Sequence, residues 1–228
     1  MKAIISDIHA NLAALEAVIA DIDRQGISDI LCLGDIVGYN AQPDECISLI
    51  RERNIPFLLG NHDSYITTGK NCERSEVVAG IINDHREMLS DESINWLDTG
   101  KEKFVYGTDI FFHGGPQDPM DQYIYEVNEA TFPKNVLRMF VGHTHVQTVI
   151  KIGEKVFCNP GSVGQPRDGD PRAAYATITH DEVICHRVDY DVERTIRAMQ
   201  ERNYEAFKYY GLRTGTQIGG RQSEIITV

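Results

Sequence analysis

Three short apolar segments in the first third of the chain each run into polar residues, and this feature constrains the fold more than any other. Asp7, Asp35 and Asn61 follow closely after these segments. In an open parallel sheet, ligands bind outside the carboxyl ends of the strands, so three endings of this kind indicate one shared site. The three predicted strands are residues 3–6, 30–33 and 56–59.

Helical signals separate the predicted strands. Asn11 is a good N-cap residue before an apolar stripe at helical spacing, and Pro43 suits the first turn of a second helix. The first third therefore predicts a βαβαβ order. Further helices are expected within 75–98, where Ser90 or Asp91 can start a second helix, and over 192–199. The stripe consists of Leu12, Leu15, Ile19 and Ile22.

Short strand signals dominate the second half, which predicts a second, largely antiparallel sheet. We expect an α/β fold with two packed mixed β-sheets flanked by helices, a four-layer αββα sandwich. Residues 1–210 are expected to form a single domain, followed by a tail over 211–228 that is either loop or ordered by a partner. The strands are expected at 104–106, 110–112, 138–141, 146–152, 156–158, 173–179 and 183–188.

The charge balance argues against two classes of partner. The formal net charge is -12, from 22 Lys plus Arg against 34 Asp plus Glu, which disfavours long nucleic acid and anionic membranes. The five cysteines are widely spaced and contain no CxxC pair, which suits a reducing compartment. The first apolar stretch is too short for a signal peptide, and no run approaches the ~20 apolar residues of a membrane helix. We therefore expect a cytoplasmic protein.

Five motifs contain seven potential metal ligands: two carboxylates, one amide and four imidazoles. This donor set suffices for two metal ions, although each motif alone is weak. In an extended segment residues i and i+2 lie on the same side, so pairs such as His143 and His145 are expected to face one point. Structural or surface roles are expected for His85, His180 and His186. The seven candidate ligands are Asp7, His9, Asp35, Asn61, His113, His143 and His145.

The order of these motifs (DxH, GD, GNHD, H and GHxH) resembles the calcineurin-like metallophosphoesterase superfamily. Residues 159–167 resemble a loop of its compact bacterial and archaeal phosphodiesterases. The resemblance implies two divalent or trivalent ions (Mn, Fe, Zn, Co or Ni, with Mn or Fe favoured), bridged by Asp35. One ion would be bound by Asp7, His9, Asp35 and His145, and the other by Asp35, Asn61, His113 and His143.

The resemblance also implies a mechanism in which a hydroxide bridging the two ions attacks phosphorus, without a protein nucleophile. His62 would stabilise the transition state or protonate the leaving oxygen, and Asp63 would orient His62 and raise its pKa. Both are therefore candidate catalytic residues.

Four residues are candidates for substrate binding. Arg167 lies in a Gly- and Pro-shaped loop and can grip two phosphoryl oxygens, although a plain surface arginine is an alternative. Tyr39 and Asn40 follow the Asp35 motif, and Asn11 follows the Asp7 motif, where its N-cap position is also a sufficient explanation. Substrate specificity is expected to depend on the loops around Tyr39 and over 67–74 and 117–125.

One departure from the family pattern narrows the function. Asp35 is followed by Ile-Val-Gly-Tyr-Asn, whereas the Ser/Thr protein phosphatases and symmetrical diadenosine tetraphosphatases of the superfamily have Asp-Arg-Gly. This favours an enzyme that hydrolyses phosphodiester or phosphoanhydride bonds of a small substrate such as a nucleotide: a small phosphodiesterase, a cyclic-nucleotide hydrolase or an asymmetrical dinucleoside polyphosphate hydrolase. A phosphomonoesterase or protein phosphatase, a noncatalytic metal-binding scaffold for protein partners and a nuclease are the alternatives. The sequence leaves homo-oligomerisation open.

Overall fold

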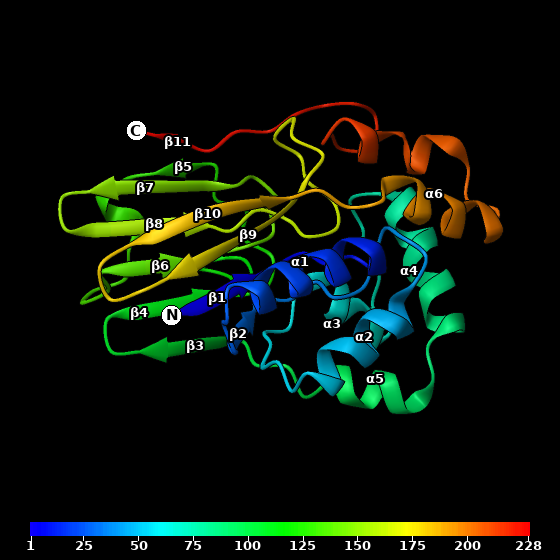
Figure 1. The fold of residues 1–228 in the computed structure, drawn as a ribbon, viewed down its shortest axis with the longest axis horizontal. Helices are drawn as coiled ribbons and strands as arrows, with labels where there is room; N and C mark the ends of the chain where they lie inside the picture. Colours follow the sequence, from blue (N-terminus) through cyan, green and yellow to red (C-terminus); the bar gives the residue numbers. More distant parts are fainter.

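Two mixed β-sheets lie face to face at the centre of the protein, as the computed structural model of residues 1–228 shows (Figure 1). The first sheet has the strand order β10-β9-β1-β2, in which β1 is parallel to β2 and antiparallel to β9. Its strands are β1 (Lys2–Ile5), β2 (Asp29–Cys32), β9 (Ala173–Ile178) and β10 (Val183–Val188).

The second sheet has the order β3-β4-β6-β8-β7. Its three central strands are parallel and its two outer strands are antiparallel to their neighbours. The prediction that this sheet is largely antiparallel is therefore wrong. Its central strands β4, β6 and β8 are parallel, and the antiparallel strands β9 and β10 join the first sheet instead. The strands are β3 (Lys103–Tyr106), β4 (Asp109–Phe112), β6 (Arg138–Phe140), β7 (Thr148–Ile152) and β8 (Lys155–Asn159).

The predicted third strand over residues 56–59 is reduced to isolated bridges. Phe57 pairs with Cys32, and Leu58 pairs with Lys101. Pro56 has no N–H to donate, and its carbonyl accepts a hydrogen bond from the Cys32 N–H at 3.0 Å. The segment still runs beside β2 and delivers the next residues to the same edge of the sheet.

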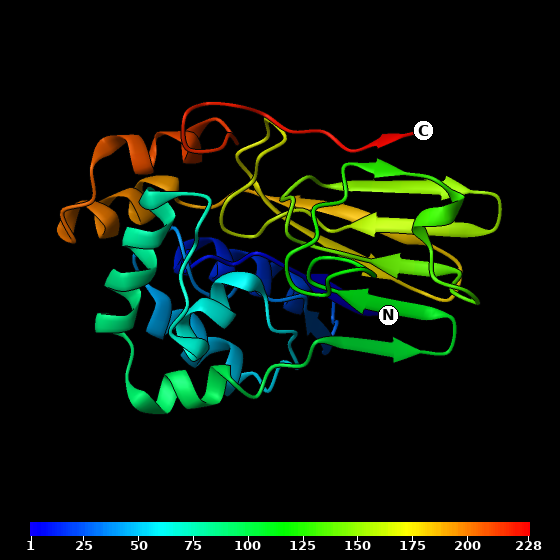
Figure 2. The same cartoon turned by 180° about the vertical axis from the view of Figure 1, so that it is seen from behind.

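Six α-helices gather around the first sheet and at one end of the two sheets (Figures 1 and 2). The predicted caps Asn11 and Ser90 are present, and Ser75 caps a third helix: each side chain accepts a hydrogen bond from a backbone N–H in the first turn. The helices are α1 (Leu12–Arg24), α2 (Pro43–Glu52), α3 (Asn61–Thr68), α4 (Glu76–Met88), α5 (Asp91–Leu97) and α6 (Val192–Glu201).

Alternation along the strands divides the core into two layers. In β1, Ala3 and Ile5 pack among the helices, whereas Ile4 belongs to the cluster between the two sheets. In that cluster Phe111 of the second sheet stacks on Phe140 with ring centroids 4.7 Å apart. The expected α/β fold with two packed mixed sheets flanked by helices is confirmed.

An irregular segment and the C-terminal tail cover the outer face of the second sheet. The segment contains β5 (Glu126–Val127) and the short 3-10 helix η1 (Glu129–Thr131), and it contributes Ile124 and Phe132 to the core on that face. Strand β11 (Ile226–Thr227) of the tail pairs in parallel with β5, as Figure 2 shows from behind. This pairing shows that contacts within the same chain order the tail. Two short 3-10 helices, η2 (Ala206–Lys208) and η3 (Tyr210–Arg213), lead into it.

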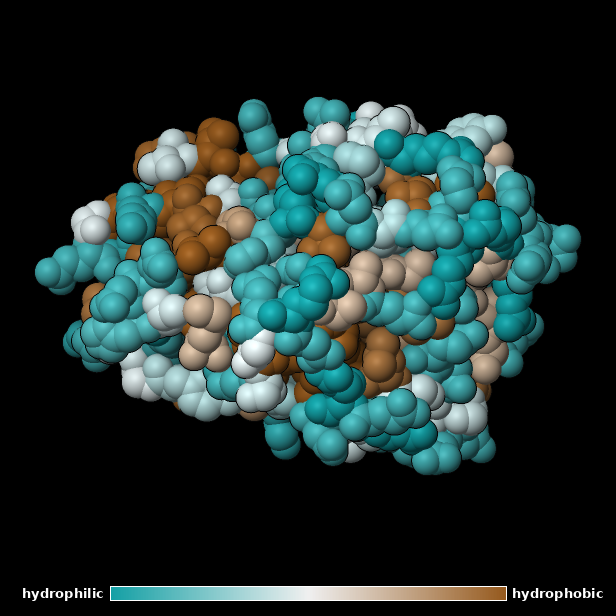
Figure 3. Space-filling view, in the orientation of Figure 1, coloured by the Kyte–Doolittle hydropathy of each residue, from teal (hydrophilic) through white to brown (hydrophobic).

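Hydrophilic side chains cover most of the face drawn in Figure 3, with smaller apolar patches among them. None of the helices has the length and apolar character needed to cross a membrane.

Candidate metal centre and active site

The candidate ligands gather just beyond the carboxyl ends of four strands. Asp7 follows β1, Asp35 follows β2, His113 follows β4 directly, and His143 lies three residues after β6. All four side chains are buried. The strand endings seen in the sequence therefore converge in space, although they come from two different sheets.

Five of the seven candidate ligands have a left-handed backbone. Their φ values are 54° for Asp7, 49° for His9, 53° for Asp35, 65° for His143 and 60° for His145. This conformation is costly for residues other than glycine, by about 1–3 kcal/mol each, and it concentrates at functional sites. The pairs Asp7–His9 and His143–His145 thus reach the site from tight turns. The expectation that they lie on extended segments is wrong.

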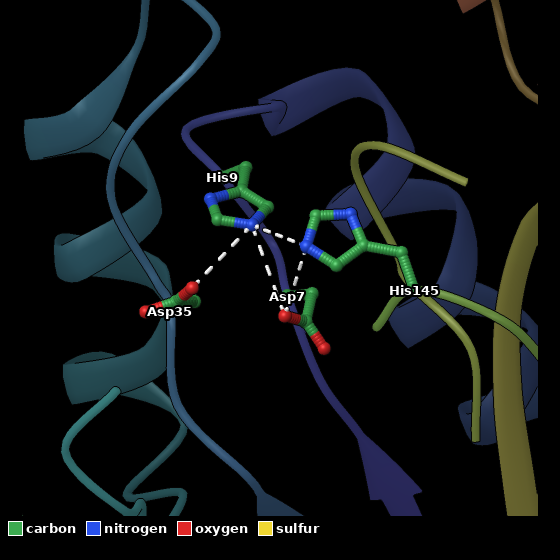
Figure 4. A group of neighbouring side chains, drawn as sticks. All are labelled: Asp7, His9, Asp35 and His145. Atoms are coloured by element: carbon green, nitrogen blue, oxygen red, sulfur yellow. Dashed lines mark hydrogen bonds and ion pairs between the residues drawn. The ribbon is translucent and has the colours of Figure 1, made fainter. Parts of the chain in front are cut away.

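Asp7, His9, Asp35 and His145 form the first group of candidate ligands, with one donor atom of each within 4.8 Å of the others (Figure 4). The Nε2 atoms of His9 and His145 are 3.0 Å apart, and His145 Nε2 is 3.2 Å from Asp7 Oδ1. His9 Nε2 lies 3.6 Å from Asp35 Oδ2. Two carboxylates and two imidazoles therefore point into one small space.

The hydrogen bonds of the two imidazoles show that this space suits a cation. His9 Nδ1–H donates to the carbonyl of Val37 at 2.8 Å, and His145 Nδ1–H donates to that of Gln165 at 2.6 Å. Burial lowers the pKa of both imidazoles, so both are neutral and both Nε2 atoms carry lone pairs. Two facing lone pairs repel each other unless a cation lies between them. Carbonyl acceptors behind histidine ligands are typical of metal sites.

Asp35, His113 and His143 form the second group. His113 Nε2 lies 3.3 Å from Asp35 Oδ2, 3.2 Å from His143 Nδ1 and 3.3 Å from Asn61 Oδ1. His113 Nδ1–H donates to the carbonyl of Leu33 at 2.9 Å, so Nε2 is the nitrogen that faces Asp35. Burial alone would lower the pKa of this imidazole, but the charge of Asp35 raises it to about 9. The structure therefore places all seven candidate ligands in two adjacent groups.

Asp35 belongs to both groups. Its Oδ1 accepts a hydrogen bond from the His62 N–H at 2.9 Å, whereas its buried Oδ2 has no hydrogen-bond partner. Burial alone would raise the pKa of this carboxyl, but His113 and His62 hold it well below its ordinary value. The residue is thus an ionised carboxylate with an unpartnered oxygen, as a bridging ligand requires.

His62 lies beside the first group. Its ring centroid is 4.8 Å from that of His9 and 5.0 Å from that of Tyr39, and its side chain is buried. Burial lowers its pKa to about 4, and its Nδ1 has no hydrogen-bond partner.

Asp63 does not contact the His62 imidazole, so the expectation that it orients His62 and raises its pKa is wrong. Its Oδ1 accepts hydrogen bonds from the N–H groups of Ile36 and Val37 at 2.9 and 3.2 Å, and its Oδ2 accepts one from Gly60 at 3.1 Å. As the third residue of α3, Asp63 turns back toward the free N–H groups at the start of its helix. It ties the Asp35 loop to the start of α3 and so positions both.

Arg167 is almost fully buried, with 7% of its surface exposed. Its Nη2 donates to the Tyr39 hydroxyl at 2.8 Å, its Nε has no partner, and no carboxylate forms an ion pair with it. The alternative of a plain surface arginine is therefore excluded.

Asn11 and Asn40 form hydrogen bonds mainly within the protein. Asn11 Oδ1 accepts from Ala14 N and Thr195 Oγ1, and its Nδ2 donates to the carbonyl of Gly164 at 3.0 Å. Asn40 Nδ2 donates to the carbonyl of His9 at 2.8 Å. These contacts explain both residues structurally, and their contact with substrate stays a prediction.

Comparison with known proteins identifies the family. The profile described as "Calcineurin-like phosphoesterase superfamily domain" matches residues 1–206 of the 228. The chain belongs to the calcineurin-like phosphoesterase superfamily. This membership, together with the buried Asp and His groups, supports a metal-dependent hydrolase of phosphoric esters.

Three proteins that are similar to this chain illustrate its membership of the superfamily. The uncharacterized protein MJ0912 of Methanocaldococcus jannaschii is 35% identical over 223 residues, covering 85% of this chain and 89% of the relative. The metallophosphoesterase from Sphaerobacter thermophilus is 34% identical with a TM-score of 0.81, covering 94% of this chain and 99% of its own. The protein PH1004 from Pyrococcus horikoshii OT3 has a TM-score of 0.85 at 21% identity, covering 95% of this chain and 100% of its own, and shows the shared fold.

Sequence reasoning missed several residues of this phosphoesterase-family site. Asp121 Oδ1 lies 3.3 Å from His143 Nε2 and forms an ion pair with Arg74. The Tyr123 ring lies over His143, with centroids 3.8 Å apart. Arg74, Asp121 and Tyr123 lie in or next to the two loops expected to affect specificity, but no local pattern indicates that these side chains turn toward the metal ligands.

His85 has the structural role expected for it. It is buried in α4, accepts a hydrogen bond from Gly38 N–H at 3.1 Å on Nδ1, and donates from Nε2 to the Asn40 carbonyl at 2.7 Å. It thereby holds the loop on either side of Tyr39. His180 is exposed, and His186 pairs with Thr177 away from the candidate ligands.

Proposed function

We propose that this protein is a dinuclear-metal phosphoesterase that hydrolyses phosphodiester or phosphoanhydride bonds of a small, nucleotide-sized substrate. The observation that carries the proposal is the pair of facing Nε2 lone pairs of His9 and His145, next to the carboxylate of Asp35 that both ligand groups share. A cation bound between these donors would relieve the repulsion of the two lone pairs. The mixed nitrogen and oxygen donors suit Mn, Fe, Zn, Co or Ni, with Mn or Fe favoured.

The seven candidate ligands would hold the two ions. When bound, such ions acidify water and neutralise charge on a phosphoryl group. Asp35 keeps the two ligand groups together, and the hydrogen bonds from His9, His113 and His145 to backbone carbonyls fix the orientation of the imidazoles.

His62 and Arg167 complete the proposed chemistry. The imidazole of His62 has no hydrogen bond within the protein, so it is free to hydrogen bond a phosphoryl or leaving oxygen. The guanidinium of Arg167 is buried without a carboxylate, which is costly unless an anion joins it. A phosphate group supplies that anion, and Tyr39 holds the guanidinium in place.

The charge of the chain favours a small substrate. With a net charge of -12, the protein attracts neither the backbone of a long nucleic acid nor an anionic membrane. Turnover of small diesters should accordingly change little with salt concentration.

The test is hydrolysis of bis(4-nitrophenyl) phosphate in the presence of Mn²⁺. Wild-type protein should turn the diester over, and Asp35→Asn should abolish turnover, because it removes the charge that both ligand groups share. Asp181→Asn is the matched control, because it removes the same charge from an aspartate on an exposed turn. Absence of turnover in a protein that binds both ions would contradict the proposal and favour a noncatalytic scaffold.

A further inference from the structure

A small pocket opens beside the candidate metal centre. Its volume is about 210 Å³, and two aromatic residues, Tyr39 and Tyr123, line it. Each of them also touches a candidate ligand: the Tyr39 ring is 4.6 Å from that of His9, and the Tyr123 ring is 3.8 Å from that of His143. The pocket is therefore next to the place where a phosphate would bind. We call it the Gln165 pocket; its other lining residues are Ser75, Val77, Val78, Gln165, Arg167, Gln217 and Ile218.

Two buried polar side chains in this lining have unused hydrogen-bonding groups. Gln165 is 2% exposed and its Oε1 has no partner, although its backbone carbonyl binds the His145 imidazole. Arg167 is 7% exposed and its Nε has no partner. Unpartnered buried groups are costly and indicate that a ligand completes them.

Three of the other lining residues are apolar, and part of the lining comes from the C-terminal tail. Val77, Val78 and Ile218 contribute aliphatic surface. The tail is fixed next to the pocket because the Ser223 N–H donates to the carbonyl of Arg167 at 2.8 Å and Gln217 Nε2 donates to Ser223 Oγ at 2.7 Å. The tail thus closes a pocket that already contains the buried Arg167.

We propose that the Gln165 pocket binds the base of a nucleotide whose phosphate lies at the metal centre, an inference that rests on the proposed function. A primary amide offers a donor and an acceptor side by side, which matches the edge of a nucleobase. Tyrosine rings bind the faces of bases. The volume of 210 Å³ is below the ~300–1,000 Å³ of pockets for drug-sized ligands, so the pocket suits one ring system.

Competing occupants fit the pocket less well. A second phosphate would meet one cation, Arg167, among tyrosine and aliphatic walls. A purely apolar group would leave Oε1 of Gln165 buried without a partner. A base attached to the bound phosphate satisfies the amide and the aromatic surface together.

Two chromogenic diesters with the same leaving group test the inference. Thymidine 5′-(4-nitrophenyl phosphate) carries a base, and methyl 4-nitrophenyl phosphate does not. The wild-type protein with Mn²⁺ should show a kcat/KM at least about tenfold higher for the thymidine ester, as base stacking and the amide contact predict. Equal values for the two esters would overturn the pocket inference and leave the proposed function standing. Absence of turnover with both esters would overturn the proposed function, and the inference with it.

Two variants locate the base. Gln165→Leu removes the amide at similar size, and Ile218→Trp fills the pocket from the tail, so each should lower the ratio of the two kcat/KM values by about tenfold. Gln200→Leu, the same substitution on the exposed side of α6, should keep the wild-type ratio. A wild-type ratio in both pocket variants would contradict the assignment. The two variants perturb different segments, so misfolding of one leaves the other as the test.

Discussion

The loop around Tyr39 depends on a buried neutral histidine, which predicts a specific pH dependence of stability. His85 accepts a hydrogen bond from Gly38 N–H and donates one to the Asn40 carbonyl, at 3.1 and 2.7 Å. Burial lowers its pKa to about 4, whereas the Asn40 bond acts in the opposite direction. The perturbation we suggest is His85→Gln, because glutamine can replace part of this hydrogen bonding but does not titrate.

The size of the effect follows from the two pKa values of His85. Between its ordinary pKa of ~6.5 and its folded pKa of about 4, the unfolded state binds a proton that the folded state does not. The stabilisation is therefore fully present above ~pH 6.5 and is lost as the pH falls toward ~4. When the pH falls from about 7.5 to about 5, protonation of this single group in the unfolded state should lower the free energy of unfolding by ~2 kcal/mol.

Urea unfolding of the metal-free protein measures this loss. The free energy of unfolding would be determined in EDTA for wild type and His85→Gln at about pH 7.5 and about pH 5. The other buried histidines titrate in both proteins, so they cancel when the two are compared. Wild type should lose ~2 kcal/mol more than the variant over this range. An equal loss in both proteins would show that His85 is not a buried neutral group and would refute the reasoning.

Three further predictions follow from other contacts. His62→Ala should keep both metal ions yet lose most of kcat, because His62 lies beside the ligands without being one of them; elemental analysis and steady-state kinetics check this, and retained turnover would exclude the role. Gly60→Ala should lower metal content and activity together, because the added Cβ would clash with Asp35 Oδ1; a fully loaded, active variant would contradict this. Phe140→Ala should lower the free energy of unfolding by about 3–5 kcal/mol, since its ring is fully buried against Phe111 between the sheets. Chemical denaturation measures this loss, and a clearly smaller value would contradict the prediction.

The sequence predicted the parts of the fold that depend on local patterns. Apolar spacing and caps such as Asn11 located every helix except α3, and short strand signals located β7, β8, β9 and β10. The placement of β9 beside β1 could not be predicted, because strand order depends on pairing between distant segments. The strand expected at Pro56 reduces to bridges for a local reason, since proline cannot donate a ladder hydrogen bond.

The same distinction applies to the candidate site. The spacing of Asp7, His9, His143 and His145 indicated that they share a site, but their left-handed turns are a property of the backbone that no residue pattern reveals. The contact of Asp63 with the Asp35 loop and the position of Asp121 beside His143 both depend on how separate loops meet. Buried and unpaired groups such as Arg167 can be recognised only once their surroundings are known.

The central claim is that Asp35 joins two metal sites that act together. Metal-free protein titrated with Mn²⁺, while turnover of bis(4-nitrophenyl) phosphate and bound metal are followed together, tests it most directly. The two ligand groups predict that activity rises to its plateau only as the second ion per chain is bound, and that Asp35→Asn neither holds two ions nor turns over the diester. A plateau of full activity at one ion per chain would contradict this account.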